Sequence, residues 1–492
     1  MNLSTLIHGL PFITVVNHHE CTITKITDKS NEVVPGTLFV CIPGYRVDGH
    51  QFAEEAVAKG AVAIVASQPV EVTVPTLYVR NTRRALAILL DRFYDHPTQH
   101  LRLIGVTGTN GKSTVTYLLE QIFQDAGYRT GLIGTIERKV GTTSFPTNNT
   151  TPDPVTLQET FALMRKEKTD YAMMEVSSHA LTQGRVWGCK FRSAIFTNLT
   201  QDHLDYHHTK EAYAYAKSLL FAQLGNAYEG ENLPVAILNG DDPASKLMAE
   251  ATAAPVLTYA IHEQADVRAT NVTLNSDGVQ FIVESFAGSA PFALHLMGRF
   301  NVYNALAVIT AALLEGLSLE QIKASLEKAH GVPGRCERVE AGQPFRVIVD
   351  YAHTPDGLQN VLQTMKEVKE GRLISVCGCG GDRDRSKRPL MAQISTQLAD
   401  LSVFTSDNPR TEVPEAILQD MLTGVQNDPD ATYEVIENRR DAIQYAIAQA
   451  EPGDIVIIAG KGHETYQEIN GVRHHFDDRE EAAEAIHLRY HR

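Results

Sequence analysis

The feature that most constrains this chain is a glycine-rich segment between an apolar run and an amphipathic helix. Residues Leu101–Val106 predict a buried strand, and apolar residues recur on one face of the helix that follows. A strand, a glycine-rich turn and a helix together present backbone N–H groups and a helix N-terminus, which favour phosphate binding. The residues expected to bind ATP in this turn are Gly108, Thr109, Asn110, Gly111, Lys112, Ser113 and Thr114.

This loop departs from the strict P-loop spacing, because Val106 occupies the position of its first glycine. It is therefore a shorter variant, in which Lys112 is expected to reach the β- and γ-phosphates and Ser113 to offer a hydroxyl to Mg²⁺. The alternative is a glycine-rich turn with a chance Gly-Lys-Ser, but the flanking strand and helix favour nucleotide binding. Nucleotide binding alone does not distinguish a ligase from a P-loop switch protein.

The length of 492 residues indicates about three domains at roughly 150 residues each. Breaks are predicted at Asp95-His96-Pro97 and at Gly331-Val332-Pro333-Gly334. The expected domains are residues 1–97, 98–331 and 332–492. Apolar runs alternate with helical segments, most regularly in the last domain, and this pattern predicts an α/β protein with mostly parallel sheets.

Composition limits the function classes. The formal charge is 44 − 59 = −15, which disfavours a general nucleic-acid binder. No apolar run approaches the ~18 residues of a membrane span, and no secretory signal is evident. We therefore expect a cytoplasmic protein with neither nucleic-acid nor membrane partners. Six cysteines do not predict a disulfide framework, and Cys377 and Cys379 lack the spacing of a zinc site.

Further segments resemble the Mur ligases, in order and across nearly the whole chain. The loop by itself is also similar to that of folylpolyglutamate synthases. The matching segments are Asn149-Thr150-Thr151-Pro152, Glu175-Val176-Ser177-Ser178-His179, Asn198–Asp205, Ala216–Phe221, Asn301–Asn304, Asp350–Pro355, Gly380–Arg385, Asp407-Asn408-Pro409-Arg410 and Gly460-Lys461-Gly462-His463-Glu464. The resemblance implies a small N-terminal α/β domain for a uridine nucleotide, a central P-loop ATPase-like domain and a C-terminal Rossmann-like domain for an amino acid.

Within that family, the chain resembles the members that add diaminopimelate. The resemblance implies a monomeric, ATP- and Mg²⁺-dependent amide ligase of peptidoglycan precursor synthesis. It would join meso-2,6-diaminopimelate to the D-glutamate γ-carboxylate of UDP-N-acetylmuramoyl-L-alanyl-D-glutamate through an acyl phosphate. Carboxylate and γ-phosphate are both anionic, so Lys112 and Mg²⁺ suit the cancelling of their repulsion. A lysine-adding member and a folylpolyglutamate synthase-like ligase are the alternatives.

The assignment of residues around the reacting phosphate rests partly on this resemblance. Glu175 ends an apolar strand at the edge where α/β proteins bind ligands, so a functional role is expected from its position alone. The resemblance implies that Ser113, Glu175, His203 and Lys217 surround magnesium. It also implies further ATP-binding positions at Asn304, Arg335 and Asp350.

Lys217 and the nearby histidines have ordinary interpretations too. As a residue type on a helix, Lys217 would be a solvated lysine. The resemblance instead implies that it carries a carbamate, which needs a neutral amine and so a lowered lysine pKa. The residue pattern predicts that His207 and His208 form an exposed polar turn.

Substrate recognition is divided between two sets of residues. Ser30 matches the family pattern for the uridine nucleotide, although Asn31 replaces the usual arginine. The residues that the resemblance assigns to the muramoyl dipeptide are Asn149, Thr150, Thr151, Ser177, Gln183 and Arg185. Those assigned to diaminopimelate are Arg383, Asp407, Asn408, Pro409, Arg410, Gly460 and Glu464. Among these, Arg410 can pair with the distal carboxylate that lysine lacks, and Asp407 or Glu464 can receive the distal ammonium.

Overall fold

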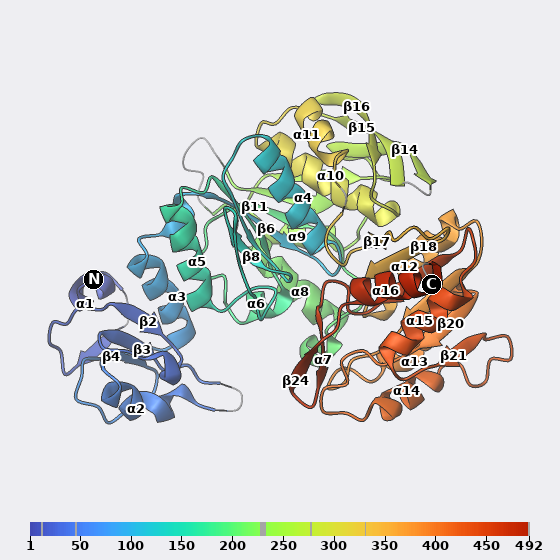
Figure 1. The fold of residues 1–492 in the computed structure, drawn as a ribbon. Coiled ribbons are helices and arrows are strands. Elements are labelled where there is room, and N and C mark those ends of the chain that lie inside the picture. The colour runs from blue at the N-terminus through green and yellow to red at the C-terminus, as the bar shows by residue number, and fades with distance from the viewer. Residues whose placement is uncertain (11–12, 45–46, 227–232, 276–277, 330, 491–492) are drawn as a thin grey trace.

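Three helix-covered sheets follow one another along the chain (Figure 1). The structure, a computed structural model, describes residues 1–10, 13–44, 47–226, 233–275, 278–329 and 331–490. The N-terminal sheet and the C-terminal sheet lie at the two ends of Figure 1, with the central sheet between them. The predicted α/β class is confirmed, while the domain limits at residues 97 and 331 remain predictions.

The N-terminal sheet has the order β1-β5-β4-β3-β2, and only β1 runs antiparallel to its neighbour. Its strands are β1 (Thr14–Val16), β2 (Lys25–Thr27), β3 (Thr37–Val40), β4 (Ala61–Ala66) and β5 (Thr76–Tyr78). Its helices are α1 (Leu3–Ile7), α2 (Ala53–Ala58) and α3 (Thr82–Phe93), with short 3₁₀ turns at Ser30–Glu32, Gly49–Phe52 and Pro97–Gln99. Helix α3 begins at Thr82 because the Asn81 side chain accepts a hydrogen bond from Arg84 N and caps it.

The central sheet has eleven strands in the order β16-β15-β14-β13-β12-β11-β6-β10-β7-β8-β9. Its middle strands, from β14 to β7, pair in parallel, and both edges are antiparallel. The strands are β6 (Arg102–Thr107), β7 (Thr130–Ile133), β8 (Arg138–Val140), β9 (Thr143–Phe145), β10 (Tyr171–Glu175), β11 (Phe191–Phe196), β12 (Val235–Asn239), β13 (Val256–Ala260), β14 (Val267–Asn275), β15 (Gly278–Ser285) and β16 (Gly288–Leu294).

Helices cover both faces of this sheet and form two separate cores. The helices are α4 (Lys112–Asp125), α5 (Pro154–Lys166), α6 (Ser178–Thr182), α7 (Leu204–His207), α8 (Lys210–Phe221), α9 (Ser245–Ala251), α10 (Arg299–Leu314) and α11 (Leu319–Leu326). Strand β6 is central and buried, and a Cβ on Gly105 would lie 2.7 Å from the Phe191 ring. Since β6, β10, β11 and β12 are parallel, their carboxyl ends meet at one edge of the sheet.

Strands β14 and β15 form an antiparallel hairpin. At its turn the Asn275 side chain accepts a hydrogen bond from Gly278 N at 2.9 Å, while residues 276–277 lie outside the described part. Phe281 and Phe292 stack with ring centroids 5.7 Å apart on the face that packs toward α10.

The C-terminal sheet has the order β17-β18-β22-β19-β20-β21, with only β17 antiparallel. Its strands are β17 (Glu337–Val339), β18 (Arg346–Asp350), β19 (Leu373–Cys377), β20 (Leu401–Phe404), β21 (Tyr433–Val435) and β22 (Ile455–Ala459), and a separate hairpin is made of β23 (Tyr466–Ile469) and β24 (Val472–His475). The helices are α12 (Pro355–Val368), α13 (Lys387–Leu398), α14 (Pro414–Leu422), α15 (Arg439–Gln449) and α16 (Asp478–Tyr490). None of the helices in the described part has both the length and the apolar character that crossing a bilayer needs.

Candidate active site

The Gly108–Thr114 loop joins β6 to α4 at the carboxyl edge of the central sheet. A Cβ on Gly108, whose φ is 150°, would lie 1.8 Å from Thr197 Oγ1. A Cβ on Gly111, whose φ is 86°, would lie 2.3 Å from Asn304 Oδ1. Both glycines are therefore required sterically, and Asn304 is placed directly against the loop.

The segment after β11 supports this loop. Asn110 N donates to Asn198 Oδ1 at 2.9 Å, and Thr109 N donates to Asn198 O at 2.9 Å. Thr197 Oγ1 donates to Asn110 O at 2.6 Å. Ser113 and Thr114 are buried in the first turn of α4. The loop is thus preorganised by hydrogen bonds from the neighbouring strand end.

Two lysines converge on one carbonyl of the loop. Lys112 Nζ donates to Gly108 O at 2.9 Å and to Thr109 O at 2.7 Å, and Lys217 Nζ donates to Gly108 O at 2.7 Å. Lys217 is only 1% exposed and also lies 4.3 Å from the centre of the Tyr213 ring. The residue-type prediction of a solvated lysine is wrong, because α8 packs this side chain beneath the loop.

Burial and the Lys112 charge together hold the pKa of Lys217 well below its usual range. Burial also lowers the pKa of Lys112, although Glu175 and Asp202 oppose this effect. The unusual feature is therefore a pair of adjacent lysines, one of them almost completely buried. Such a pair is suited to anionic ligands and favours a neutral Lys217 amine.

Glu175 ends β10 beside the loop and is 1% exposed. Its carboxylate accepts hydrogen bonds from Thr135 N at 2.9 Å and from Thr135 Oγ1 at 3.0 Å. A Cβ on Gly134 would lie 2.5 Å from Glu175 Oε1, so this glycine permits the close approach. The carboxylate is thus fixed at the strand edge where the sequence predicted a functional group.

His203 follows Asp202 with a positive φ of 53°, and its Nε2 lies 3.4 Å from Asp202 Oδ2. The ring packs edge-on against His179 with centroids 4.8 Å apart, and its side chain is 43% exposed. The expectation for His207 is wrong: it is buried, and its Nε2 lies 2.9 Å from Ser178 Oγ. Its place in α7 turns it inward, whereas His208 is exposed.

The unmodified side chains of the four residues expected around magnesium do not supply enough ligand atoms to bind it. No group of three His, Cys, Asp or Glu side chains suited to a metal occurs in the described part of the chain. Mg²⁺ prefers oxygen ligands, and Glu175 and Ser113 offer them. The Lys217 ammonium cannot bind a cation, because it has hydrogen-bond donors and no lone pair. The set fits Mg²⁺ when Lys217 carries a carboxylate-like group and substrate oxygens complete the coordination.

Most residues expected at the muramoyl dipeptide form one network next to Glu175. Thr151 Oγ1 donates to Glu175 O at 2.7 Å and accepts from Ser177 N at 3.0 Å. Arg185 Nη1 donates to Thr151 O at 2.7 Å, and its Nε donates to Gln183 Oε1 at 3.0 Å.

One further dipeptide position, Thr150, extends this network, and Asn149 lies next to it in the chain. Thr150 joins it through Thr135, with 3.0 Å between their hydroxyls, and Asn149 precedes Thr150 with its carbonyl accepting from Thr147 Oγ1.

Ser30 lies on the N-terminal domain in the 3₁₀ turn Ser30–Glu32. The adjacent Lys29 Nζ lies 3.4 Å from Asp153 Oδ2, and Asp153 caps α5 directly after the Thr150–Pro152 segment. The uridine-site candidate is therefore connected to the dipeptide network through one ion pair between domains.

The C-terminal domain also reaches the loop. Arg335 Nη2 donates to Ser113 Oγ at 3.3 Å, and the Arg335 guanidinium lies 4.6 Å from the centre of the Tyr351 ring. Asp350, at the end of β18, accepts from Cys336 N at 2.7 Å. The structure thus brings Arg335 to the loop and places Asp350 against the Arg335–Cys336 segment.

The residues expected at diaminopimelate meet at the carboxyl edge of the C-terminal sheet. Asn408 Nδ2 donates to Glu464 Oε2 at 2.8 Å, and a Cβ on Gly460 would lie 2.6 Å from Asp407 Oδ2. Arg410 has a positive φ of 52°, and its Nη1 donates to Gly381 O at 2.7 Å.

Two further positions border this cluster. A Cβ on Gly381 would lie 1.9 Å from Pro409 O. Arg383 is exposed at the margin of the cluster and donates to the Asp382 carbonyl.

Three charged residues of this region were not singled out from the sequence. Lys461 is fully buried among Asp407, Asn408 and Glu464. Asp356 accepts hydrogen bonds from the central domain, and Asp202 faces both Lys112 and His203. Each lies within or beside a segment that carries the family resemblance, so a charge inside a matching segment was the signal available.

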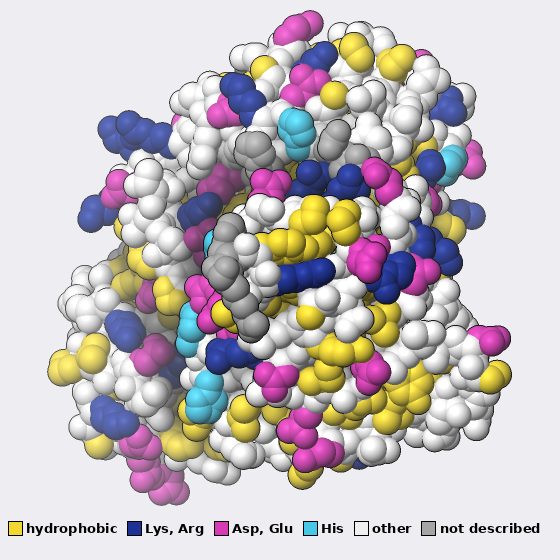
Figure 2. Space-filling view, turned by 45° about the vertical axis from the view of Figure 1, so that its right-hand side comes forward, with side chains coloured by type: hydrophobic (Ala, Val, Ile, Leu, Met, Phe, Trp, Pro, Cys, Tyr) yellow, Lys and Arg dark blue, Asp and Glu magenta, His cyan; other side chains and the backbone are white. Residues whose placement is uncertain are grey.

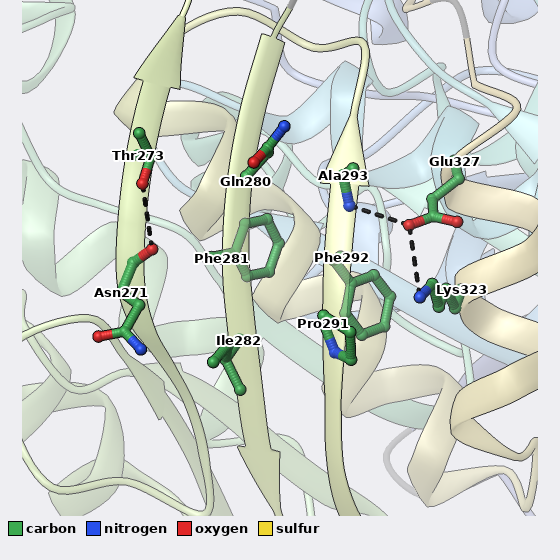
Figure 3. A pocket seen from close by; sticks show the side chains of 10 residues that line it. All are labelled: Asn271, Thr273, Gln280, Phe281, Ile282, Pro291, Phe292, Ala293, Lys323 and Glu327. Atoms are coloured by element: carbon green, nitrogen blue, oxygen red, sulfur yellow. Dashed lines mark hydrogen bonds and ion pairs between the residues drawn. The ribbon is translucent and has the colours of Figure 1, made fainter.

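One hollow of the described part, of about 320 Å³, lies away from these residues and is lined by β14, β15, β16 and α11 (Figure 3). There Glu327 accepts from Ala293 N at 2.9 Å and lies 3.8 Å from Lys323 Nζ. On the face shown in Figure 2, acidic and basic side chains are interspersed. At the candidate site, by contrast, two lysines lie together, Lys217 buried and Lys112 partly buried.

Comparisons with known proteins cover nearly the whole chain. Three family models match it: "Mur ligase family, catalytic domain" at residues 22–94, "Mur ligase middle domain" at residues 106–312 and "Mur ligase, glutamate ligase domain" at residues 334–462. The chain is 52% identical over 486 residues to UDP-N-acetylmuramoyl-L-alanyl-D-glutamate–2,6-diaminopimelate ligase of Listeria monocytogenes, covering 99% of both proteins.

Solved structures agree with these matches. A structure of a ligase with the same name aligns with a TM-score of 0.69 and 37% identity over 96% of both chains. MurF ligase from Thermotoga maritima in complex with ADP aligns with a TM-score of 0.63 over 94% of this chain and 97% of that chain, and at 17% identity it supports the fold alone. The expected three-domain architecture is confirmed, and the chain belongs to the Mur ligase family.

Proposed function

We propose that this protein joins meso-2,6-diaminopimelate to the D-glutamate γ-carboxylate of UDP-N-acetylmuramoyl-L-alanyl-D-glutamate, with ATP hydrolysed to ADP and phosphate. The relatives at 52% identity bear the name of this activity. The structural observation that supports this function most is that the carboxyl edges of the central and C-terminal sheets face each other. Contacts such as Arg335 to Ser113 bring the C-terminal domain against the Gly108–Thr114 loop.

The activating step is proposed to occur at this loop. Gly108–Thr114 would bind the ATP phosphates together with Asn304, Arg335 and Asp350. Transfer of the γ-phosphoryl group to the D-glutamate carboxylate would form an acyl phosphate and release ADP. Lys112 would neutralise the phosphate oxygens as they approach the carboxylate. The hydrogen bond that the loop donates from Asn110 N to the Asn198 side chain supports this assignment, because it fixes the loop before ATP binds.

Magnesium would be held by Ser113, Glu175, His203 and a carbamate on Lys217, and would supply charge neutralisation between the two anions. A buried lysine with a lowered pKa offers the neutral amine that attacks CO₂. The new N–C bond forms as the amine loses one proton, and the product is an anionic carbamate. Carbamate formation thus gives Lys217 an anionic oxygen ligand next to the Lys112 ammonium.

The remaining residues are proposed to position the other substrates. Ser30 would contact the uridine nucleotide, and the Thr151, Ser177, Gln183 and Arg185 network, with Asn149 and Thr150, would hold the muramoyl dipeptide. Asp407–Arg410, Arg383, Gly460 and Glu464 would bind diaminopimelate. An amino group of the bound diaminopimelate would then attack the acyl phosphate carbon. The resulting tetrahedral intermediate would expel phosphate and leave the amide.

Two alternative ligases are less well supported. A lysine-adding enzyme would have no partner for Arg410, and the loop similarity to folylpolyglutamate synthases leaves the uridine domain unexplained. A cytoplasmic location and a monomeric state remain predictions.

Phosphate release tests the proposal directly. Purified protein, Mg²⁺, ATP and UDP-N-acetylmuramoyl-L-alanyl-D-glutamate are combined with diaminopimelate, with L-lysine or with no amino acid. Diaminopimelate-dependent release with formation of the tripeptide product is expected. Equal release with lysine would favour the lysine-adding alternative, and release with a folate substrate alone would favour the folate ligase.

A further inference from the structure

Lys461 is an ammonium buried completely within the cluster proposed to bind diaminopimelate. It follows β22, and its Nζ lies 2.9 Å from Asn408 Oδ1, 3.4 Å from Glu464 Oε2 and 3.8 Å from Asp407 Oδ1. A buried ammonium is costly unless it is paired and hydrogen-bonded. The two carboxylates on either side of Lys461 therefore offset the cost of burying its ammonium.

The same lysine fixes the orientation of its neighbours. Asn408 Oδ1 accepts from Lys461 Nζ and from Glu468 N, both at 2.9 Å. The amide nitrogen of Asn408 must then point the other way, and it donates to Glu464 Oε2 at 2.8 Å. Both donors to Glu464 lie on Oε2, so Oε1 is turned to the opposite side of the carboxylate.

The charges of the cluster leave one negative charge in excess. Asp407 and Glu464 contribute two negative charges and Lys461 one positive charge, and the titratable groups Tyr351 and Tyr466 also face Glu464. The buried Arg439 guanidinium faces Asp407 as well, but its charge is balanced by Asp478 at 2.7 Å. Burial and the Asp407 charge raise the pKa of Glu464, while Lys461 and the Asn408 hydrogen bond lower it. The cluster is thus matched to one additional cation.

We propose that Lys461 is a positioning residue for the amino-acid substrate, holding Asp407 and Glu464 in the charged, fixed arrangement that receives the distal ammonium of diaminopimelate. This inference rests on the proposed function. Lys461 acts through the two carboxylates and does not itself need to touch the substrate. Its loss should therefore affect the binding of one substrate in a pH-dependent way.

The test measures steady-state kinetics for Lys461→Met and Lys461→Gln between about pH 6 and 9. The second variant can still donate hydrogen bonds but carries no charge, so it remains informative if the first does not fold. At neutral pH, KM for diaminopimelate is expected to rise roughly 10- to 100-fold, while kcat and the KM values for ATP and the UDP-sugar change little. Without the lysine, Glu464 gains a proton more readily, so the KM defect should shrink as pH rises.

A double-mutant cycle with Glu464→Gln isolates the interaction. Adding Lys461→Gln to Glu464→Gln should raise KM much less than it does in the parent enzyme. The control is Lys139→Met, because Lys139 also lies between two carboxylates, 3.1 Å from Glu120 and 3.3 Å from Glu137, but within the central domain. This control should leave KM for diaminopimelate unchanged.

The outcomes separate the two proposals. If the parent enzyme releases no phosphate with diaminopimelate, the proposed function fails. If the parent is active and both Lys461 variants show either unchanged KM or an equal, pH-independent loss toward all substrates, the positioning role is overturned and Lys461 serves only the stability of the loop.

Discussion

Asn110 in the Gly108–Thr114 loop donates its side-chain amide to Asp356 at 2.8 Å, and this bond joins the central domain to the C-terminal domain. Thr200 Oγ1 donates to the same carboxylate oxygen at 2.9 Å. Asp356 lies in the first turn of α12, where a carboxylate is also stabilised by the helix N-terminus. One carboxylate therefore couples the proposed ATP loop to the domain proposed to bind the amino acid.

Asp356→Ala is expected to loosen the approach of the two domains. Two hydrogen bonds between the domains, of about 1 kcal/mol each, are lost together with one from Asn360 within α12, so kcat/KM for ATP and diaminopimelate should fall roughly tenfold or more. Affinity for the UDP-sugar should be retained, because Ser30 and Arg185 lie away from this contact. Kinetics would be combined with small-angle scattering, and unchanged kinetics with an unchanged radius of gyration would show that the contact is incidental.

Lys112→Ala is expected to abolish ligation while leaving the fold intact. Among the described residues, the hydrogen bonds of this side chain go to the carbonyls of its own loop, Gly108 and Thr109, so its removal breaks no hydrogen bond between elements. Loss of a preorganised cation at the transferring phosphoryl group should cost about 10³-fold in kcat or more. Phosphate release and thermal melting would be measured together. Full ATP turnover in a folded variant would contradict the phosphate-binding assignment.

Lys217→Ala is expected to lose activity, and added acetate is expected to restore part of it. The alanine leaves space beneath Gly108 where a small carboxylate can replace the carbamate. In the parent enzyme the lowered lysine pKa makes the neutral amine available at lower pH than for an exposed lysine, so carbamate formation should increase as pH rises through that lowered value.

Mass spectrometry after chemical trapping with labelled CO₂ would detect the Lys217 adduct. Lys210→Ala, at the start of the same helix α8, is a matched control that should neither lose the adduct nor respond to acetate. Full activity of Lys217→Ala without acetate, together with no adduct in the parent, would leave Lys217 as a buried structural lysine.

The sequence predicted the elements at the site better than the environments of its side chains. The Leu101–Val106 run and the glycines after it predicted the strand-loop-helix unit, because hydrophobic period and glycine position are local properties. The burial of Lys217 was not predictable from its residue type, since it depends on how α8 packs under the loop. His207 was misjudged for the same reason, because tertiary packing determines which face of a short helix is buried.

Contacts between domains also could not be predicted from local sequence patterns. Asn110 and Asp356 are 246 residues apart, and neither local pattern indicates that they meet. Lys461 stood in a segment matched to the family, but only the fold places its ammonium between carboxylates that come from two separate strand ends. Residue types thus indicated the chemistry of the site, while its charge balance required the structure.

Arg410→Ala is expected to remove the preference for diaminopimelate over lysine. Arg410 is held by its bond to the Gly381 carbonyl and by Glu468 Oε2 at 3.8 Å, which aim the guanidinium along the loop. Lysine would leave this partly buried cation without the second carboxylate of the substrate, and a site built around a polar partner rejects an analogue that lacks it by up to about 10⁴–10⁵-fold. Arg410→Lys should not restore function well, because an ammonium cannot reproduce the planar two-point pairing.

The measurement is kcat/KM for diaminopimelate and for L-lysine with the parent, Arg410→Ala and Arg410→Lys. We expect a loss of about 10²-fold or more with diaminopimelate, the scale of leaving a buried charge unpaired, and little change in the poor activity with lysine. Binding of ATP and of the UDP-sugar should be nearly unchanged, because their proposed residues lie mainly on the other two domains. An equal loss for both amino acids would instead mean that Arg410, whose backbone has a positive φ of 52°, shapes the loop without recognising the second carboxylate.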